Sequence, residues 1–426
     1  MTEKPRFFYG YTILLISAIS MILIYGIRHS FNVFFQPVLE EFGWSRSSTA
    51  LILSLNLLVY GILAPISGNF ADRWKPKIVM STGVLILGIG TAGCALATQL
   101  WHFYILFGLI VPLGMVFTGV PVFIPAIANW FKRKRAMAIG IGMAGCGLSF
   151  SMSMYAEVLI STFGWQWAYI IMGSTVVGIV IPLLLLFFKY RPKTPVDAAG
   201  IIKDKSSINM NGDNAEAIDS EFVINKTLSQ ILRSYRLWLL VLAYMLNVGT
   251  ANFLVITHQV IYAWDLGYSS VFAASVAGLV GLFVALGNIS AFVADRIGME
   301  KTSTFATGLS VISLVILLLQ SDASFPWAMY VFAVCFGLGL GLYAPTVAAG
   351  AADLFYGKHF GTVNGLLVMG FGLGGAIGPW LGGYIHDISG SYTSAYICCL
   401  IFYCLACLAV WIAAPRKAVK PRPGIK

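Results

Sequence analysis

Residues 68–77 read Gly-Asn-Phe-Ala-Asp-Arg-Trp-Lys-Pro-Lys and separate two long apolar runs of the sequence. Residues 291–301 read Ala-Phe-Val-Ala-Asp-Arg-Ile-Gly-Met-Glu-Lys and also stand between two apolar runs. A further match supports a repeat, because Gly-Cys-Gly at 145–147 has a counterpart in Gly-Leu-Gly at 372–374. The chain is therefore expected to contain two similar halves, each with its own copy of the Asp-Arg junction.

The composition indicates a membrane protein. Of the 426 residues, 58% are hydrophobic and 10% are charged, whereas soluble globular proteins carry about 25% charged residues. In lipid, every backbone N–H and C=O must be satisfied within the protein, which leaves helices or closed barrels as spanning structures. The apolar runs are continuous for about 20 residues, which is the length of a membrane-spanning helix. The predicted fold class is an all-α membrane protein.

Twelve apolar runs are long enough to be membrane helices, and a polar stretch at 189–236 divides them into six and six. They lie at 11–35, 49–70, 78–97, 101–127, 136–160, 165–188, 237–263, 270–294, 302–319, 326–352, 360–385 and 393–413. We expect an N-terminal six-helix half at 1–190 and a C-terminal six-helix half at 237–414. A cytoplasmic central loop at 191–236 and a basic cytoplasmic tail at 415–426 complete the predicted organisation.

Apolar residues recur at helical spacing near the end of the central loop. They are Leu228, Ile231, Leu232 and Tyr235, and basic residues surround them. This pattern predicts a short amphipathic helix that lies on the inner membrane surface. The alternative is a helix that docks a protein partner.

Basic residues occupy alternate gaps between the apolar runs. With the N-terminus inside, only Arg28 and Arg46 of the 27 Lys and Arg residues fall outside the inner segments. Cytoplasmic loops of membrane proteins carry such an excess of Lys and Arg, so both termini are predicted to be cytoplasmic. This topology explains the net charge of +10, and no nucleic-acid partner is expected. Compact outer loops without an N-glycosylation sequon favour a bacterial inner membrane.

The sequence contains no motif that predicts catalysis or a cofactor. All seven cysteines lie inside apolar runs without metal-ligand spacing, as is typical of small packing residues. Gly-Ile-Gly at 140–142 lies within an apolar run, where no strand precedes it to form a nucleotide-binding loop. We therefore expect neither an enzyme nor a bound cofactor or metal ion, and no obligate protein partner.

The stretch at 68–77 fits the pattern G-x-x-x-D-R/K-x-G-R/K-R/K, except that Pro76 replaces a usual glycine or basic residue. With this motif and its six-plus-six repeat, the chain resembles the major facilitator superfamily. The resemblance implies two halves that rock around a central site. It also implies a conformational gate at the inner side, formed by Asp72, Arg73, Asp295 and Arg296.

Four stretches resemble the monocarboxylate and oxalate–formate branch of that superfamily. They lie at 26–35, 119–136, 258–267 and 361–392. The resemblance implies secondary transport of a small organic anion, a monocarboxylate, by proton symport or exchange. In one departure, Gly287 and Asn288 stand where this branch usually has an arginine that grips the substrate carboxylate.

Arg28 is the main candidate for binding a substrate anion. It is the one Lys or Arg inside any apolar run, where a charge costs about 2.5–3.5 kcal/mol and needs a partner or a function. We predict that it anchors a carboxylate; the alternative is that it reaches the outer headgroups. Asn32 lies one turn further along the same helix face. The predicted substrate-binding set is completed by His258, Asn288 and Tyr343.

His258 and Asp265 lie two helical turns apart on one predicted helix. They are predicted to form a proton path, because an imidazole titrates near neutral pH; the alternative is a packed, hydrogen-bonded pair. Two other functions stay open at this stage. One is an efflux carrier for a hydrophobic compound, and the other is a membrane sensor that does not transport.

Overall fold

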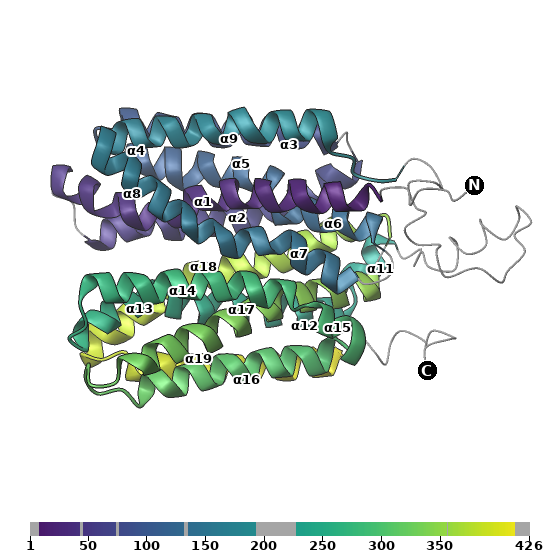
Figure 1. Ribbon diagram of the computed structural model, residues 1–426. Coiled ribbons are helices and arrows are strands. Elements are labelled where there is room, and N and C mark those ends of the chain that lie inside the picture. Colours follow the sequence, from purple (N-terminus) through teal and green to yellow (C-terminus); the bar gives the residue numbers. More distant parts are fainter. Residues whose placement is uncertain are drawn as a thin grey trace, which may run out of the picture.

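The computed structural model describes residues 8–42, 46–73, 76–131, 135–192, 227–355 and 357–413. These residues form helices joined by short turns, with no strand among them. The long helices run side by side along one axis of the molecule (Figure 1). The prediction of an all-α fold is confirmed for the described residues.

The N-terminal half holds the first six predicted spans, two of which are interrupted. The fourth span breaks at Gly119, which separates α5 from α6 and is followed by Val120 and Pro121. The helices are α1 (Gly10–Phe42), α2 (Arg46–Arg73), α3 (Pro76–Gly93), α4 (Leu100–Ile105), α5 (Val111–Thr118), α6 (Val120–Trp130), α7 (Arg135–Leu148), α8 (Met152–Phe163) and α9 (Trp165–Phe187). Short turns of other helical types link some of them: η1 (Cys94–Leu96), η2 (Leu106–Ile110) and η3 (Ser149–Ser151).

The C-terminal half holds the other six predicted spans. A wide π-helical turn, η5 (Tyr244–Ala251), interrupts the seventh span between α12 and α13. The helices are α11 (Leu228–Leu232), α12 (Tyr235–Ala243), α13 (Asn252–Asp265), α14 (Ser270–Ile289), α15 (Phe292–Ile297), α16 (Met299–Leu318), α17 (Pro326–Phe355), α18 (Phe360–Ser389) and α19 (Thr393–Ala413).

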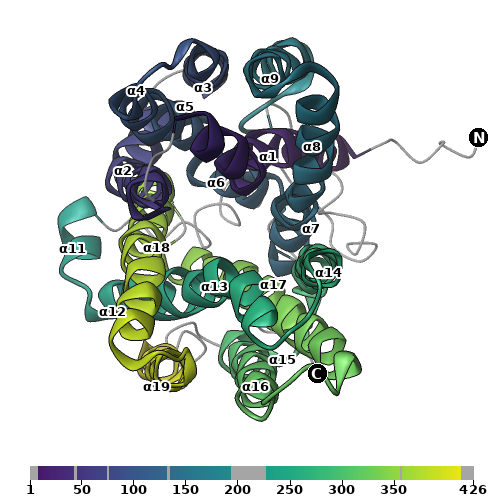
Figure 2. The same cartoon turned by 90° about the vertical axis from the view of Figure 1, so that its left-hand side faces the viewer.

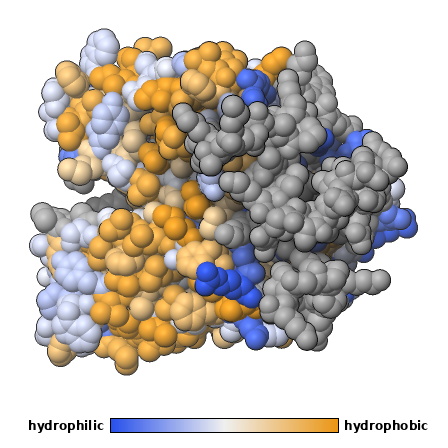
Figure 3. Space-filling model, turned by 45° about the vertical axis from the view of Figure 1, so that its right-hand side comes forward, coloured by the Kyte–Doolittle hydropathy of each residue, from blue (hydrophilic) through white to orange (hydrophobic). Residues whose placement is uncertain are grey.

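The twelve predicted apolar runs all fall on these helices. Eleven spans of the described chain are long and apolar enough to cross a membrane, and the remaining run has its apolar part at Leu51–Ser67 within α2. Large apolar side chains such as Leu186 and Trp327 are 70% and 64% exposed on the outer flanks. Figure 3 shows apolar surface over the flanks of the two halves. Apolar surface of this extent is typical of a surface that faces lipid.

The predicted amphipathic helix at the end of the central loop is shorter than expected. α11 ends at Leu232, and Tyr235 opens α12, which is the start of the seventh span. α11 begins at a capping box in which Thr227 and Gln230 satisfy each other's backbone N–H groups. The inclusion of Tyr235 was therefore wrong. The rest of the central loop, at 193–226, and the tail from 414 lie outside the described residues.

Two pairs of helices join the halves along a seam of glycines. α2 packs against α18 and α7 packs against α14 (Figure 2). A Cβ atom at Gly61 would lie 2.6 Å from the Cα of Gly372, and one at Gly147 would lie 2.4 Å from the backbone nitrogen of Ala285. Small residues allow helix backbones to approach this closely in membranes. The seam therefore depends on positions that have no room for a side chain.

We expect Gly61→Val to lower the melting temperature of the purified protein, because the added side chain must push α2 away from α18. Overpacking of this kind costs about 1–3 kcal/mol. Gly178→Val in α9 is the matched control, since a Cβ there meets nothing within 4 Å. Thermal unfolding of both variants in detergent tests the expectation, and equal melting temperatures would contradict it.

Candidate functional site

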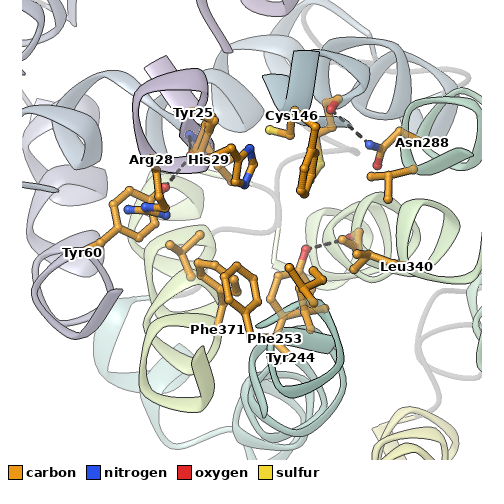
Figure 4. Close-up of a pocket in the computed structure, with 18 residues that line it drawn as sticks. Tyr25, Arg28, His29, Tyr60, Cys146, Tyr244, Phe253, Asn288, Leu340 and Phe371 are labelled. Carbon is orange, nitrogen blue, oxygen red and sulfur yellow. Dashed lines mark hydrogen bonds between the residues drawn. The ribbon is translucent and has the colours of Figure 1, made fainter. Parts of the chain in front are cut away.

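A cavity of about 130 Å³ lies between the two halves. A single water needs about 10–15 Å³, so the cavity is large enough to hold a small solute. Figure 4 shows Arg28 and His29 on one side of it and Tyr244 and Phe253 on the other. Aromatic and aliphatic side chains make up most of the lining, and Arg28 is the one permanently charged residue in the described part of it.

Arg28 is buried at this cavity and does not reach the outer headgroups. Its side chain is 3% exposed, its Nε donates to Asn56 Oδ1 at 2.9 Å, and its guanidinium lies 4.5 Å from the centre of the Tyr60 ring. The Nη2 atom is buried and has no hydrogen-bond partner. Among the described residues, no carboxylate pairs with this arginine. The structure thus presents a buried cation whose donors are mostly unused.

Two tyrosines and an asparagine fix the position of the guanidinium. The Tyr25 and Tyr60 hydroxyls lie 2.6 Å apart, and the Tyr25 hydroxyl accepts from the Val120 backbone N–H at 3.0 Å. That N–H is free because the helix breaks at Gly119. Asn56 Nδ2 donates to the Phe107 carbonyl at 2.7 Å, which turns its Oδ1 toward Arg28.

His29 is a second polar group at the cavity. Its Nδ1 lies 2.8 Å from Ser149 Oγ, and its ring stacks on Phe150 with the ring centres 4.0 Å apart. The side chain is half-buried. The sequence-based prediction did not include it.

Asn56, Tyr60 and Tyr25 were also absent from the predicted site. A usable signal was present, because Asn56 and Tyr60 are polar residues four positions apart in an apolar run and thus share one helix face. The pairing of that face with Arg28 could not be read from the sequence, since it depends on how α2 packs against α1.

The profile of the Major Facilitator Superfamily matches residues 14–322 and 289–426, which together span nearly the whole chain. This chain belongs to the major facilitator superfamily. Human monocarboxylate transporter 2 is 26% identical over 92% of this chain and 82% of its own length. Human monocarboxylate transporter 11 is 26% identical over 88% of this chain and 76% of its own length. These similarities confirm the predicted resemblance to the monocarboxylate branch.

Solved structures of the superfamily share the fold. The human organic anion transporter MFSD10 superposes with a TM-score of 0.71 at 15% identity, covering 96% of this chain and all of that one (100%). The transporter FucP in its outward conformation superposes with a TM-score of 0.68 at 14% identity, covering 94% of this chain and 98% of its own. The chain is therefore a multi-pass membrane protein with the major facilitator fold.

In this major facilitator, Asn288 lines the cavity from the C-terminal half, and its role in substrate binding stays a prediction. It is 2% exposed, and its Nδ2 donates across the seam to the Met143 carbonyl at 3.1 Å. Asn364 makes a similar bond from α18 to the Val120 carbonyl in α6, also at 3.1 Å. In this conformation the Asn288 amide therefore joins the two halves. Asn32 lies in α1, and its side chain is outside the described structure.

Three other predicted site residues do not line the cavity. Tyr343 is buried within the C-terminal half, 1% exposed. His258 Nε2 lies 2.9 Å from the Pro379 carbonyl, and its ring packs beside Tyr392 at 5.0 Å between centres. Asp265 is exposed at the end of α13. The structure does not bring these residues together with Arg28, because Tyr343 lies on α17 inside the C-terminal half and His258, on α13, faces Pro379 of α18 and Tyr392. Their roles in binding and proton movement stay predictions.

One of the four residues predicted to form the inner gate, Asp295, makes a contact between the two halves. The Asp295 carboxylate, in the C-terminal half, accepts from the Ala136 and Met137 N–H groups at 3.1 and 2.9 Å. These are free donors in the first turn of α7, where the helix dipole also favours a negative charge. Beside them, Arg135 Nη1 forms a salt bridge of 3.1 Å with Asp353. The halves are thus joined by charged contacts at this end.

Of the other three predicted gate residues, Arg296 is the one whose side chain the structure describes. Arg296 lies over the Phe292 ring at 5.9 Å. The side chains of Asp72 and Arg73 lie outside the described structure, although both residues end α2. A gating function for all four residues stays a prediction.

We expect Asp295→Asn to change the rate of transport more than substrate affinity. The substitution removes the charge that caps α7 but leaves the cavity untouched, so KM should stay within about twofold while the maximal rate changes severalfold. Asp322→Asn is the matched control, because Asp322 is an exposed loop residue that accepts from the Ser324 N–H. Initial uptake rates in proteoliposomes test this; a large rise in KM at an unchanged maximal rate would contradict the gating role.

Proposed function

We propose that this protein is a secondary transporter that carries a small organic anion, a monocarboxylate, across the membrane by alternating access. The observation that carries the proposal is the state of Arg28. It is a permanent cation, 3% exposed, whose hydrogen-bond partner among the described residues is a neutral amide, and its buried Nη2 has no partner there. A carboxylate in the cavity would supply the missing partner.

The physical argument is that the hydration lost by an entering carboxylate must be replaced by interactions with the protein. An ion that leaves water loses several kcal/mol of hydration unless another charge and good hydrogen bonds replace it. The guanidinium is already desolvated by the fold, so an incoming carboxylate would meet two parallel donors in a geometry that suits it. The apolar remainder of the lining then suits the carbon skeleton of a small acid.

The position of the cavity supports alternating access. Residues of both halves line it, and Asn288 bridges the halves at its edge. The contacts of Asp295 and Arg135 join the halves near the start of α7, and the surface in Figure 3 is hollowed between the halves at the opposite end. A carrier closed at one end and open at the other has the asymmetry that alternating access requires.

The relatives support the same substrate class, because human monocarboxylate transporters 2 and 11 are named for it. In our proposal Arg28 in α1 supplies the cation that is missing at Gly287 and Asn288. Transport would be coupled to a proton or to a second anion, so that the net charge moved is small. We also propose that both termini are cytoplasmic and that the bacterial inner membrane is the site of action.

A second candidate is efflux of a hydrophobic compound. The aromatic lining, which includes Tyr60, Tyr244, Phe253 and Phe371, favours this alternative. A neutral apolar substrate would offer the buried guanidinium no charged partner, which disfavours this alternative. Substitution of Arg28 distinguishes the two functions.

We expect Arg28→Gln to raise KM for lactate by about 30-fold or more, because loss of a buried charged partner costs about 2–5 kcal/mol. In Arg28→Lys the KM for lactate should lie between those of the wild type and Arg28→Gln, since an ammonium keeps the charge but lacks the planar fork of a guanidinium. Arg236→Gln is the control, because Arg236 lies in the first turn of α12 and does not line the cavity. The measurement is uptake of labelled lactate into proteoliposomes with and without a pH gradient. Normal affinity in Arg28→Gln would refute anion transport through this site.

We expect Asn56→Asp to weaken anion binding, because the new carboxylate would pair with Arg28 in place of the substrate. A carboxylate at this position would stand at the 2.9 Å contact with Arg28 Nε and would neutralise the guanidinium permanently. KM for lactate should then rise about as much as in Arg28→Gln. Asn56→Ser, which stays neutral, should raise it far less. Equal effects of the two substitutions would show that the charge of Arg28 is not what binds the anion.

A further inference from the structure

The His29 ring is held in a fixed orientation at the edge of the cavity. One face stacks on Phe150 at 4.0 Å with the two ring planes 14° apart. The Nδ1 edge meets Ser149 Oγ at 2.8 Å, and the His29 carbonyl accepts from Ser153 Oγ at 3.1 Å. Rotation of the imidazole would break the first two contacts together.

The Ser149 contacts determine which imidazole nitrogen carries the proton. Ser149 Oγ also lies 2.5 Å from the Cys146 carbonyl. A carbonyl oxygen can only accept, so the single hydroxyl hydrogen of Ser149 must lie in that contact. The 2.8 Å contact to His29 then needs its hydrogen from Nδ1. Neutral His29 is therefore the Nδ1–H tautomer, and its Nε2 is a bare acceptor.

This acceptor is available to a solute. Neither a hydrogen bond to Nε2 nor burial of the atom is found in the described structure, and the imidazole stands at the cavity beside Arg28 in Figure 4. Other polar groups nearby are already engaged: Tyr244 donates to the Ala344 carbonyl at 2.7 Å, and Tyr25 pairs with Tyr60. On helix α1, Arg28 thus has donors that the described residues leave unused, and the adjoining His29 has an acceptor that they leave unused.

We propose that Arg28 and His29 together select small 2-hydroxy carboxylates over the corresponding 2-oxo acids, an inference that rests on the proposed function of the cavity. The carboxylate binds the guanidinium, and the 2-hydroxyl donates to His29 Nε2. A 2-oxo group has no hydrogen to donate and brings a second lone pair toward Nε2. Sites built to hydrogen-bond a substrate hydroxyl reject analogues that lack it, because the site's own polar group is left unpaired.

The test compares labelled lactate with labelled pyruvate, which differ only at the 2-position. In proteoliposomes of the wild type at pH 7.5, we expect KM for pyruvate to be about tenfold higher than that for lactate. His29→Phe keeps an aromatic ring against Phe150 but has no acceptor, so the ratio of the two KM values should fall to about one. Ser149→Ala removes the contact that fixes the Nδ1–H tautomer of His29, so the ratio of the two KM values should be intermediate. This variant provides a second measurement if His29→Phe does not fold.

The outcomes separate this inference from the proposal on which it rests. Equal KM values for the two acids in the wild type, or an unchanged ratio in both variants, would overturn the role of His29 while leaving anion transport intact. If the wild type carries neither acid and neither competes for uptake, the proposed function fails and the inference fails with it. A selective wild type whose ratio collapses in His29→Phe supports both.

Discussion

Lipid cannot hydrogen-bond to a peptide group, and the helical architecture of the described chain follows from that constraint. A helix satisfies its own backbone, so a span is stable before it meets any neighbour. Wherever the helix is interrupted, another group must take over. At Gly119 the break exposes the Val120 N–H, and the Tyr25 hydroxyl accepts from it. The Val120 carbonyl in turn accepts from Asn364 of the other half. The break is thus also a place where the halves meet at the cavity.

The same constraint makes Arg28 the centre of the site. A guanidinium has five N–H donors, and the described residues supply one amide acceptor and the face of Tyr60. A tightly paired arginine would be stable but would have nothing left to offer a solute. A wholly unpaired one would oppose folding. Partial satisfaction, fixed by Asn56 and the two tyrosines, leaves a cation that is held in place and still able to bind an anion.

The contact between the two halves is closely packed but is able to separate. Glycine lets α2 approach α18 and α7 approach α14, so the helices touch through backbone and small apolar groups that can separate without leaving many polar groups unpaired. Among the described residues, the polar bonds across the seam lie at two places: those of Asn288 and Asn364 at the cavity, and those of Asp295 and of the Arg135–Asp353 pair near the start of α7. An interface of this kind can open at one end while it closes at the other, which is what a rocking carrier needs.

The sequence by itself determined that the protein lies in a lipid membrane, that it has twelve helices and that it repeats in two halves, because these properties depend on local composition and spacing. It also singled out Arg28, since a lone charge in an apolar run is conspicuous in one dimension. It could not show that Asn56, Tyr60 and His29 belong to the site, because that depends on contacts between helices distant along the chain. It suggested Tyr343 and His258 for the site, which helix rotation turns away from the cavity. Only the tertiary structure decides which face of each helix meets the cavity, because an almost uniformly apolar helix carries little pattern to show which side is turned to protein and which to lipid.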